Sequence, residues 1–180
     1  MNKKLKNLET LKTKLLNDSI SKDETRPFLQ GFNHNAKLKA LVSSNGFTAC
    51  ILRSRYESKL SGLVIDPKTH TIINLEYPNI ARVVPDWKKL KTTTIKIEKR
   101  HFVKTKIPTK IYFSDINNAL TFDKPERYAF CLNAAFLKNL VDTDVAIAYG
   151  GEVSPILVAL HEDNFDADIF MIMPLNIKEN

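Results

Sequence analysis

Apolar residues recur with a helical period over the first part of this chain. Five leucines fall within one arc when residues are spaced at about 100° around a helix axis: Leu5, Leu8, Leu11, Leu15 and Leu16. Three lysines project from the other side: Lys3, Lys6 and Lys14. The pattern predicts an amphipathic helix that ends near residues 17–18, with its leucines on a core and its lysines in solvent.

The segments that follow have the alternation and the turn residues of antiparallel strands. We predict strands over residues 27–34, 37–44 and 47–56. The turn before the last of these contains Asn45-Gly46, and both residues tolerate the positive φ of a tight turn. A further hairpin is predicted over residues 61–77, with its turn opened by Asp66 and Pro67.

A proline-containing stretch, residues 77–87, interrupts the strands. Pro78 and Pro85 lack the N–H that a central strand needs, so this stretch is predicted to be an extended connector. The connector divides the chain into a first half (1–76), the connector itself (77–86) and a closing half with a basic middle segment (87–180).

The closing half is predicted to contain more strands and a second helix. In residues 88–113, Ile95, Ile97 and Phe102 alternate with charged residues, which indicates strands with one basic, solvated face. A helix is predicted over residues 133–141, with Asn133 as its N-cap. The remaining predicted strands cover residues 116–122, 128–133, 144–150, 155–161 and 168–175.

The last predicted strand contains an unbroken apolar run, residues 169–175. Seven residues are too few to cross a bilayer, which takes about 20 residues as a helix. The run suits a strand that is buried on both faces, or one that is buried on one face with the other open to a partner. The pattern alone leaves both readings open.

Composition and charge narrow the possible functions. The chain has 180 residues, 43% apolar and 26% charged, which is typical of a globular protein and not of a disordered one. Residues 1–110 hold 23 Lys and Arg against 9 Asp and Glu (+14), whereas residues 111–180 hold 4 against 11 (−7). The asymmetry suggests one surface that faces a polyanion such as nucleic acid. The alternative is that the lysines only make the protein soluble.

Catalytic and metal-binding patterns are missing from the sequence. The four histidines lack metal-ligand spacing, and His161-Glu162-Asp163 is predicted to be a loop between two strands. Cys50 and Cys131 lie in apolar runs and are predicted to be buried, reduced thiols. Without a signal peptide or a nucleotide-binding or nucleophile motif, the sequence predicts a cytoplasmic protein that is not an enzyme and needs no metal or cofactor.

Three separated stretches, taken in order, resemble the bacterial sliding clamp, the beta subunit of DNA polymerase III. The stretches are residues 11–54, with Leu29-Gln30-Gly31 and Ser44-Asn45-Gly46; residues 77–85, with the pattern Tyr-Pro-x-x-x-Arg-x-x-Pro; and residues 128–177, with Ser154-Pro155 and Met173-Pro174. The resemblance implies an α+β, DNA-clamp-like fold, in which an extended connector joins two half-domains of helix plus antiparallel sheet. The chain is shorter than the members of that family, and the resemblance implies a clamp-like protein whose middle segment is shortened and basic.

In that family the three stretches form a hydrophobic groove that accepts short peptide motifs from polymerases and other clamp partners. Carried over by position, the implied groove residues are Leu29, Gly46, Phe47, Ala49, Pro78, Arg82, Val83, Val153, Pro155, Met171, Met173, Pro174 and Leu175. Flexible methionines suit a surface that accepts varied apolar side chains. Phe47-Thr48 stands where the family has a polar His-Arg pair, and Asn176 stands where it often has Arg, so a more apolar groove is expected.

Three functions are compatible with the sequence. The first is a clamp-like replication or repair protein of a phage or mobile element, acting as a processivity factor or a decoy, with Lys3, Lys6 and Lys14 facing duplex DNA. The second is a nucleic-acid-binding protein that uses the basic 1–110 region without sequence preference. The third is an assembly protein whose Met-Pro edge pairs with another copy.

Overall fold

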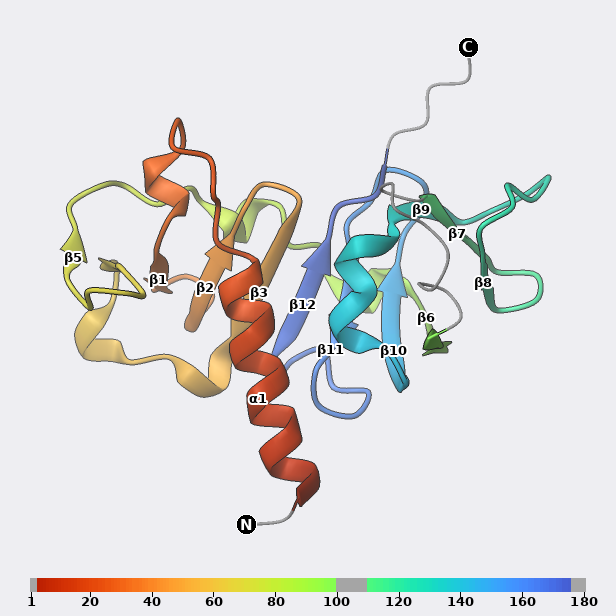
Figure 1. Ribbon diagram of the computed structural model, residues 1–180, viewed down its shortest axis with the longest axis horizontal. Helices are drawn as coiled ribbons and strands as arrows, with labels where there is room; N and C mark the ends of the chain where they lie inside the picture. The colour runs from red at the N-terminus through yellow and green to blue at the C-terminus, as the bar shows by residue number, and fades with distance from the viewer. Residues whose placement is uncertain (1–2, 100–109, 176–180) are drawn as a thin grey trace.

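The computed structural model describes residues 3–99 and 110–175, without the side chains of residues 3–6 (Figure 1). The first half contains α1 (Lys3–Asp18), η1 (Pro27–Leu29), β1 (Phe32–Asn35), β2 (Ala40–Ser44), β3 (Thr48–Leu52), η2 (Arg53–Arg55), η3 (Ser58–Leu60), β4 (Val64–Ile65) and β5 (Ile72–Ile73). The connector contains η4 (Ile80–Arg82). The closing half contains η5 (Trp87–Lys89), β6 (Lys91–Ile97), β7 (Lys110–Ser114), β8 (Ala119–Thr121), β9 (Phe130–Asn133), η7 (Ala134–Leu140), β10 (Thr143–Tyr149), β11 (Ile156–Ala159) and β12 (Ile169–Ile172).

Two antiparallel sheets organise the described residues, and the predicted α+β fold is confirmed. The larger has nine strands in the order β5-β4-β1-β2-β3-β12-β11-β10-β6, and the smaller has three, in the order β8-β7-β9. The last strand, β12, lies near the middle of the larger sheet, between β3 and β11, and all four of its residues are buried. The first four residues of the apolar run 169–175 therefore form a central strand, shorter than the predicted strand over residues 168–175. No helix among the described residues is long and apolar enough to cross a membrane.

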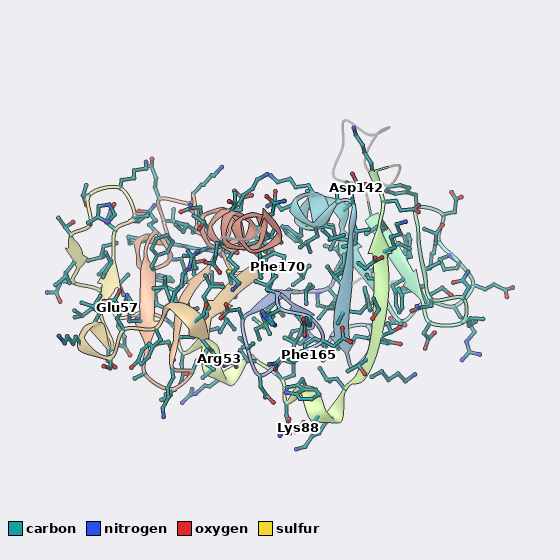
Figure 2. The ribbon with its side chains drawn as sticks, turned by 90° about the horizontal axis from the view of Figure 1, so that it is seen from below. Arg53, Glu57, Lys88, Asp142, Phe165 and Phe170 are labelled. Carbon is teal, nitrogen blue, oxygen red and sulfur yellow. The ribbon has the colours of Figure 1, made fainter. Side chains whose placement is uncertain are left out.

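The larger sheet has a hydrophobic core on each face. Figure 2 shows α1 and η7 side by side on one face, and the chain around Lys88 on the other. On the helix face, Leu15 and Leu16 pack in one cluster with Phe170. On the opposite face, Ile80 of the connector packs in a second cluster, with Trp87 against it. The leucine pattern of the sequence thus correctly predicted the buried side of α1.

Several predicted elements differ from the structure in length or type. The segment 27–34 is not one strand: Pro27 opens the 3-10 turn η1, and pairing begins only at Phe32. The segment 47–56 is a strand only as far as Leu52, after which η2 turns the chain. The helix over 133–141 is a 3-10 helix, although Asn133 caps it as predicted by accepting a hydrogen bond from the Ala135 N–H. Phe102 lies outside the described residues.

Other predictions are confirmed. The hairpin turn at Asp66 forms, and the Asp66 carboxylate accepts hydrogen bonds from the N–H groups of Lys68 and Thr69 at 2.7 and 2.9 Å. Cys50 and Cys131 are both free and buried. Burial raises the pKa of the Cys131 thiol to about 11, so this group stays protonated at neutral pH.

A buried ion pair joins α1 to the start of β12. Lys12 Nζ lies 2.9 Å from the Asp168 carboxylate, and both side chains are almost fully buried. Asp168 also accepts hydrogen bonds from the backbone and hydroxyl of Ser54 in η2. At its outer side, Lys12 contacts Glu9, which in turn pairs with Arg55. The network ties the first half of the chain to its last strand.

The outer edge of β6 is covered by the turn between β7 and β8. Asn118 of that turn donates to the Thr94 carbonyl at 3.0 Å and accepts from the Thr93 hydroxyl at 2.8 Å. Lys91 pairs with Asp115 of the same turn at 3.3 Å. The Asn118 side chain therefore occupies one backbone acceptor, the Thr94 carbonyl, that an exposed edge strand would offer to another chain.

We predict that Lys12→Met destabilises the protein by about 3–5 kcal/mol, because it leaves the Asp168 carboxylate buried without its cation. Urea denaturation at neutral pH measures this loss as a fall in the free energy of unfolding. Lys14→Met is the matched control, since Lys14 is exposed on the same helix, and it should change stability by no more than about 0.5 kcal/mol. A Lys12→Met loss as small as the control's would contradict the role of the pair.

Asp168 should also make stability depend on pH. Burial alone would raise the pKa of Asp168, but the hydrogen bonds from Ser54 and Lys12 outweigh it and lower that pKa. The stabilisation is therefore fully present above the unfolded-state pKa of about 4 and is lost as the pH falls through the folded-state pKa. Urea titrations between about pH 5 and pH 2 should show Asp168→Asn losing less stability with acid than the wild type. If the free energy of unfolding fell equally with acid in Asp168→Asn and in the wild type, Asp168 would not be the group that makes stability depend on pH.

Candidate functional site

The turn between β2 and β3 is joined directly to the end of β12. The Asn45 side-chain oxygen accepts hydrogen bonds from the N–H groups of Phe47 and Thr48, both at 2.9 Å. Gly46 lies between Asn45 and Phe47 and has a φ of +89°, a left-handed conformation that favours glycine. The Phe47 carbonyl accepts from the Met173 N–H at 2.8 Å. Local turn chemistry in the first stretch thus places Met173 of the third.

The connector reaches the same region of the sheet from the face opposite α1. Ile80 of η4 is buried in the cluster that contains Ala49 of β3 and Met171 of β12, which are register partners. Tyr77 packs against this cluster, and burial raises its pKa. Pro78 is half-buried, whereas Arg82 and Val83 of the connector are exposed. The connector therefore covers the buried residues and presents a partly exposed outer surface.

The loop between β10 and β11 supplies the next part of this surface. Val153 is 68% exposed and Pro155 is half-buried. Gly150 of this loop lies so close to Leu90 that an added Cβ would come within 2.9 Å of its side chain, and Leu90 also packs in the connector-face cluster. The loop is thus held beside the chain that follows the connector.

The predicted groove residues fall into three groups by exposure. Two form a buried floor: Ala49 and Met171. Four are half-buried: Pro78, Pro155, Met173 and Pro174. Four are exposed: Gly46, Arg82, Val83 and Val153. The second and third groups therefore have surface open to solvent, whereas the two floor residues are buried.

Three other predicted groove residues point elsewhere. The Phe47 ring stacks on Phe136 of η7 at 6.5 Å between centroids, which places it on the helix side of the turn. Leu29 is buried in η1, and its carbonyl accepts from the Ser21 N–H. Leu175 donates through its N–H to the Cys131 carbonyl at 2.8 Å, so Leu175 lies beside β9. Among these three, the Phe47 ring lies on the helix side of the turn, and the places of Leu29 and Leu175 in the groove stay predictions.

Two residues at this candidate site were not among the predicted groove residues. Arg26 is beside the turn, because a Cβ on Gly46 would come within 3.0 Å of its Nη1 atom. Tyr77 extends the buried apolar surface under the connector. Tyr77 is the first residue of the Tyr-Pro-x-x-x-Arg-x-x-Pro pattern, so the pattern itself could have indicated that Tyr77 belongs to the site. Nothing local in the sequence marks Arg26.

The lysines predicted to contact DNA lie on α1. Lys14 is exposed, and the side chains of Lys3 and Lys6 lie outside the described residues. Acidic residues share the outer surface near them: Glu9 pairs with Arg55 at 2.8 Å, and Asp18 with Lys138 at 3.9 Å. The described helix face therefore carries both signs of charge.

No protein-family model matches this sequence, and the search of curated proteins gives no match. Solved structures do match. A DNA polymerase III subunit beta sliding clamp from Bartonella birtlesii, bound to griselimycin, gives a TM-score of 0.66 at 15% identity over 97% of this chain. The C. crescentus beta sliding clamp, with PEG bound to a putative beta-motif tethering region, gives 0.65 at 13% identity over 95%. The DNA polymerase III beta subunit of Thermotoga maritima gives 0.57 at 14% identity over 95%.

These matches establish the fold: the chain is folded as a bacterial sliding clamp is, as its sequence resemblance implied. The match covers 64% of the length of each of these three clamps.

The turn geometry makes a testable demand on Gly46. Replacing it with Ala should lower the free energy of unfolding by about 1–2 kcal/mol, because an L side chain is strained at this φ. Gly46→Asn is the matched control and should cost less, since Asn tolerates positive φ. Thermal or urea denaturation of the three proteins measures the difference. Equal losses in the two variants would show that contact with Arg26, and not backbone strain, determines the cost.

Proposed function

We propose that this chain, which has the fold of bacterial sliding clamps, is a non-enzymatic protein of DNA replication or repair that binds short peptide motifs of partner proteins. The peptide site is the surface formed by the connector, the end of β12 and the β10–β11 loop. A clamp-like scaffold suits this role because it holds separated pieces of chain rigidly beside one another.

One observation carries the proposal: three segments that are far apart in sequence meet at the end of β12. The Phe47 carbonyl holds the Met173 N–H, and Ile80 of the connector packs in one cluster with Ala49 and Met171. These are the same three stretches that carry the sequence resemblance. Their convergence supports the groove residues as a single site.

The exposed residues indicate what the site would bind. Val83 and Val153 are 47% and 68% exposed, and together with the half-buried Met173 they offer apolar surface to a ligand. Arg82 adds an exposed cation at the rim. Such a surface suits a peptide with one or two large apolar anchors and little need for charge. A methionine can adjust its rotamer to anchors of different shape.

The principal test is fluorescence polarisation with a labelled peptide of the Gln-x-x-Leu-x-Phe type. The wild type should bind with micromolar affinity, and Met173→Ala and Pro78→Ala should each weaken binding about tenfold or more, as expected for anchor contacts. Ile72→Ala is the matched control, because Ile72 is 61% exposed in β5, at the far edge of the nine-stranded sheet. The control should bind as the wild type does.

Two results would contradict the proposal. One is no saturable peptide binding by the wild type. The other is equal loss in the control and in the groove variants. A parallel titration with labelled duplex DNA between about 50 and 200 mM salt tests the alternative, since binding through phosphates weakens steeply over that range. DNA binding that Lys14→Ala reduces, without any peptide binding, would favour the nucleic-acid-binding function instead.

A further inference from the structure

The larger sheet forks at the end opposite the proposed peptide site. All seven residues of β10 pair with β6, from Thr143 to Tyr149, but only Ile147 and Ala148 pair with β11. Beyond that point the Leu160 N–H bonds to the Asp168 carbonyl at 3.0 Å, so the chain follows β12 and leaves β10. Within the part of the chain that the structure describes, the edge of β10 that faces away from β6 therefore has no strand partner from Thr143 to Val145.

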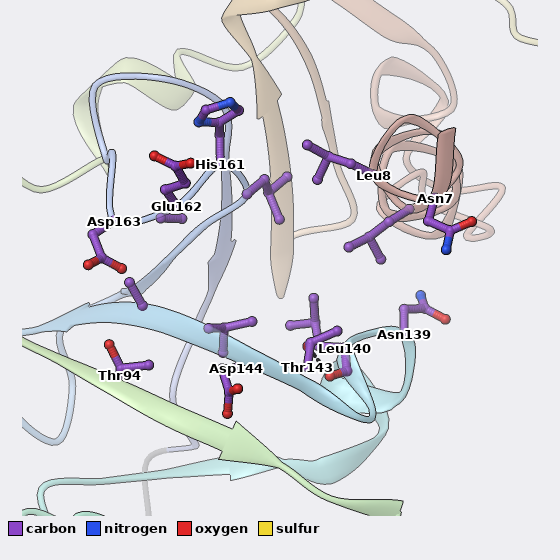
Figure 3. A pocket seen from close by; sticks show the side chains of 15 residues that line it. Asn7, Leu8, Thr94, Asn139, Leu140, Thr143, Asp144, His161, Glu162 and Asp163 are labelled. Atoms are coloured by element: carbon purple, nitrogen blue, oxygen red, sulfur yellow. Dashed lines mark hydrogen bonds between the residues drawn. The ribbon is translucent and has the colours of Figure 1, made fainter. Parts of the chain in front are cut away.

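A cavity of about 750 Å³ occupies this fork (Figure 3). It is bounded by β10 on one side, by the loop after β11 on another and by the first turns of α1 above. Its lining residues are Asn7, Leu8, Leu11, Thr94, Asn139, Leu140, Thr143, Asp144, Val145, Ala146, Ala159, Leu160, His161, Glu162 and Asp163. The volume is much larger than a single side chain needs, so a segment of another molecule fits.

The interior of the fork is apolar. Leu140 and Leu160 belong to the helix-face core and form its inner wall. Leu8 and Leu11 of α1 are only half-buried, because the N-terminal turns of the helix extend past the end of the sheet (Figure 1). In Figure 3 the Leu8 side chain points from α1 into the space above Leu140. These leucines still have apolar surface that another molecule can bury.

The rim of the fork is acidic. Its charged lining residues are Asp144, Glu162 and Asp163, and no Lys or Arg lines it among the described residues. Within residues 3–99 and 110–175, no ion pair joins any of these three carboxylates to a cation. The three carboxylates belong to the acidic part of the chain, residues 111–180, which carries a net charge of −7. The rim favours a cationic ligand and repels nucleic acid.

We propose that the fork is a second docking site, which binds an extended, basic segment of a partner protein. An apolar side chain of the segment enters between Leu8 and Leu140, and neighbouring Lys or Arg side chains reach Asp144, Glu162 and Asp163. The free edge of β10 accepts the backbone of the segment as an added strand. The fork lies at the start of β12 and the proposed peptide groove lies at its end, so one partner can occupy each.

Fluorescence polarisation with two labelled synthetic peptides tests the fork. In one peptide Val and Leu alternate with Lys, and in the other they alternate with Glu. The Lys peptide should bind the wild type, and the Glu peptide should not. Asp144→Asn/Glu162→Gln/Asp163→Asn should weaken binding of the Lys peptide at least tenfold, and Leu8→Gln should weaken it as well. Unchanged melting temperatures establish that both variants are folded.

The matched control is Glu24→Gln/Asp123→Asn/Glu126→Gln, which removes three exposed carboxylates elsewhere and changes the net charge equally. It should bind the Lys peptide as the wild type does. If both triple variants bound the Lys peptide equally weakly, the proposal would be overturned, because the peptide would then be attracted by the net charge of the protein and not by the fork. Equal binding of the two peptides, or binding of a simple alkylamine but of neither peptide, would overturn it too.

A third measurement separates the fork from the groove. The Gln-x-x-Leu-x-Phe peptide should neither displace the Lys peptide nor lose affinity in the fork variants. Displacement of one by the other would assign both to a single site and would overturn the fork as a separate one.

Discussion

The pairing of β3 with β12 is the contact on which the rest of this structure depends. It joins strands from the two ends of the described chain, with Cys50 opposite Phe170 and Ala49 opposite Met171. Side chains alternate across a sheet, so this register sends Phe170 to the helix face and Met171 to the connector face. A slip of one residue would exchange the two faces, so that Phe170 and Met171 would each have to pack in the core that fits the other. The candidate groove and the fork lie at the two ends of this same strand pair.

The buried ion pair between Lys12 and Asp168 acts on that register. Buried pairs of this kind often contribute little net stability, because removing the charges from water costs about as much as their attraction returns. Their geometry is demanding, however. Asp168 directly precedes β12, and its partners Lys12 and Ser54 lie in α1 and η2. Only one register of β12 against β3 brings the three together, so the pair favours that register over its neighbours.

Local patterns predicted the elements well and their contacts poorly. The leucine arc of α1, the Asn45-Gly46 turn and the Asn133 cap all depend on residues close in sequence, and each forms as expected. Lys12 falls within the leucine arc, which was a signal of burial. Its partner Asp168 could not be inferred from spacing, because the pair exists only once β12 has docked.

The site residues show the same division. Position in a motif predicted that the connector and the end of β12 belong to one site, and this stays a prediction. It could not show that the Phe47 ring turns toward Phe136. That contact depends on how η7 packs. The fork was equally hidden: residues 144–150 and 155–161 have the pattern of two ordinary strands, and nothing in it marks where β10 and β11 separate. The two strands separate where the Leu160 N–H bonds to the Asp168 carbonyl, next to β12, and not to β10.

The turn that covers β6 limits how this protein can assemble by extending its sheet. A closed ring or an open filament built by strand addition needs two available edges in each copy, one to give and one to receive. Here the Asn118 side chain occupies the outward Thr94 carbonyl of β6, and β5 forms the other edge of the nine-stranded sheet. Of the two outer edges in the described residues, β5 is then the more open one, and pairing of β5 with β5 of a second copy gives a two-fold symmetric dimer. The free edge of β10 lies inside the fork and is separate from these outer edges.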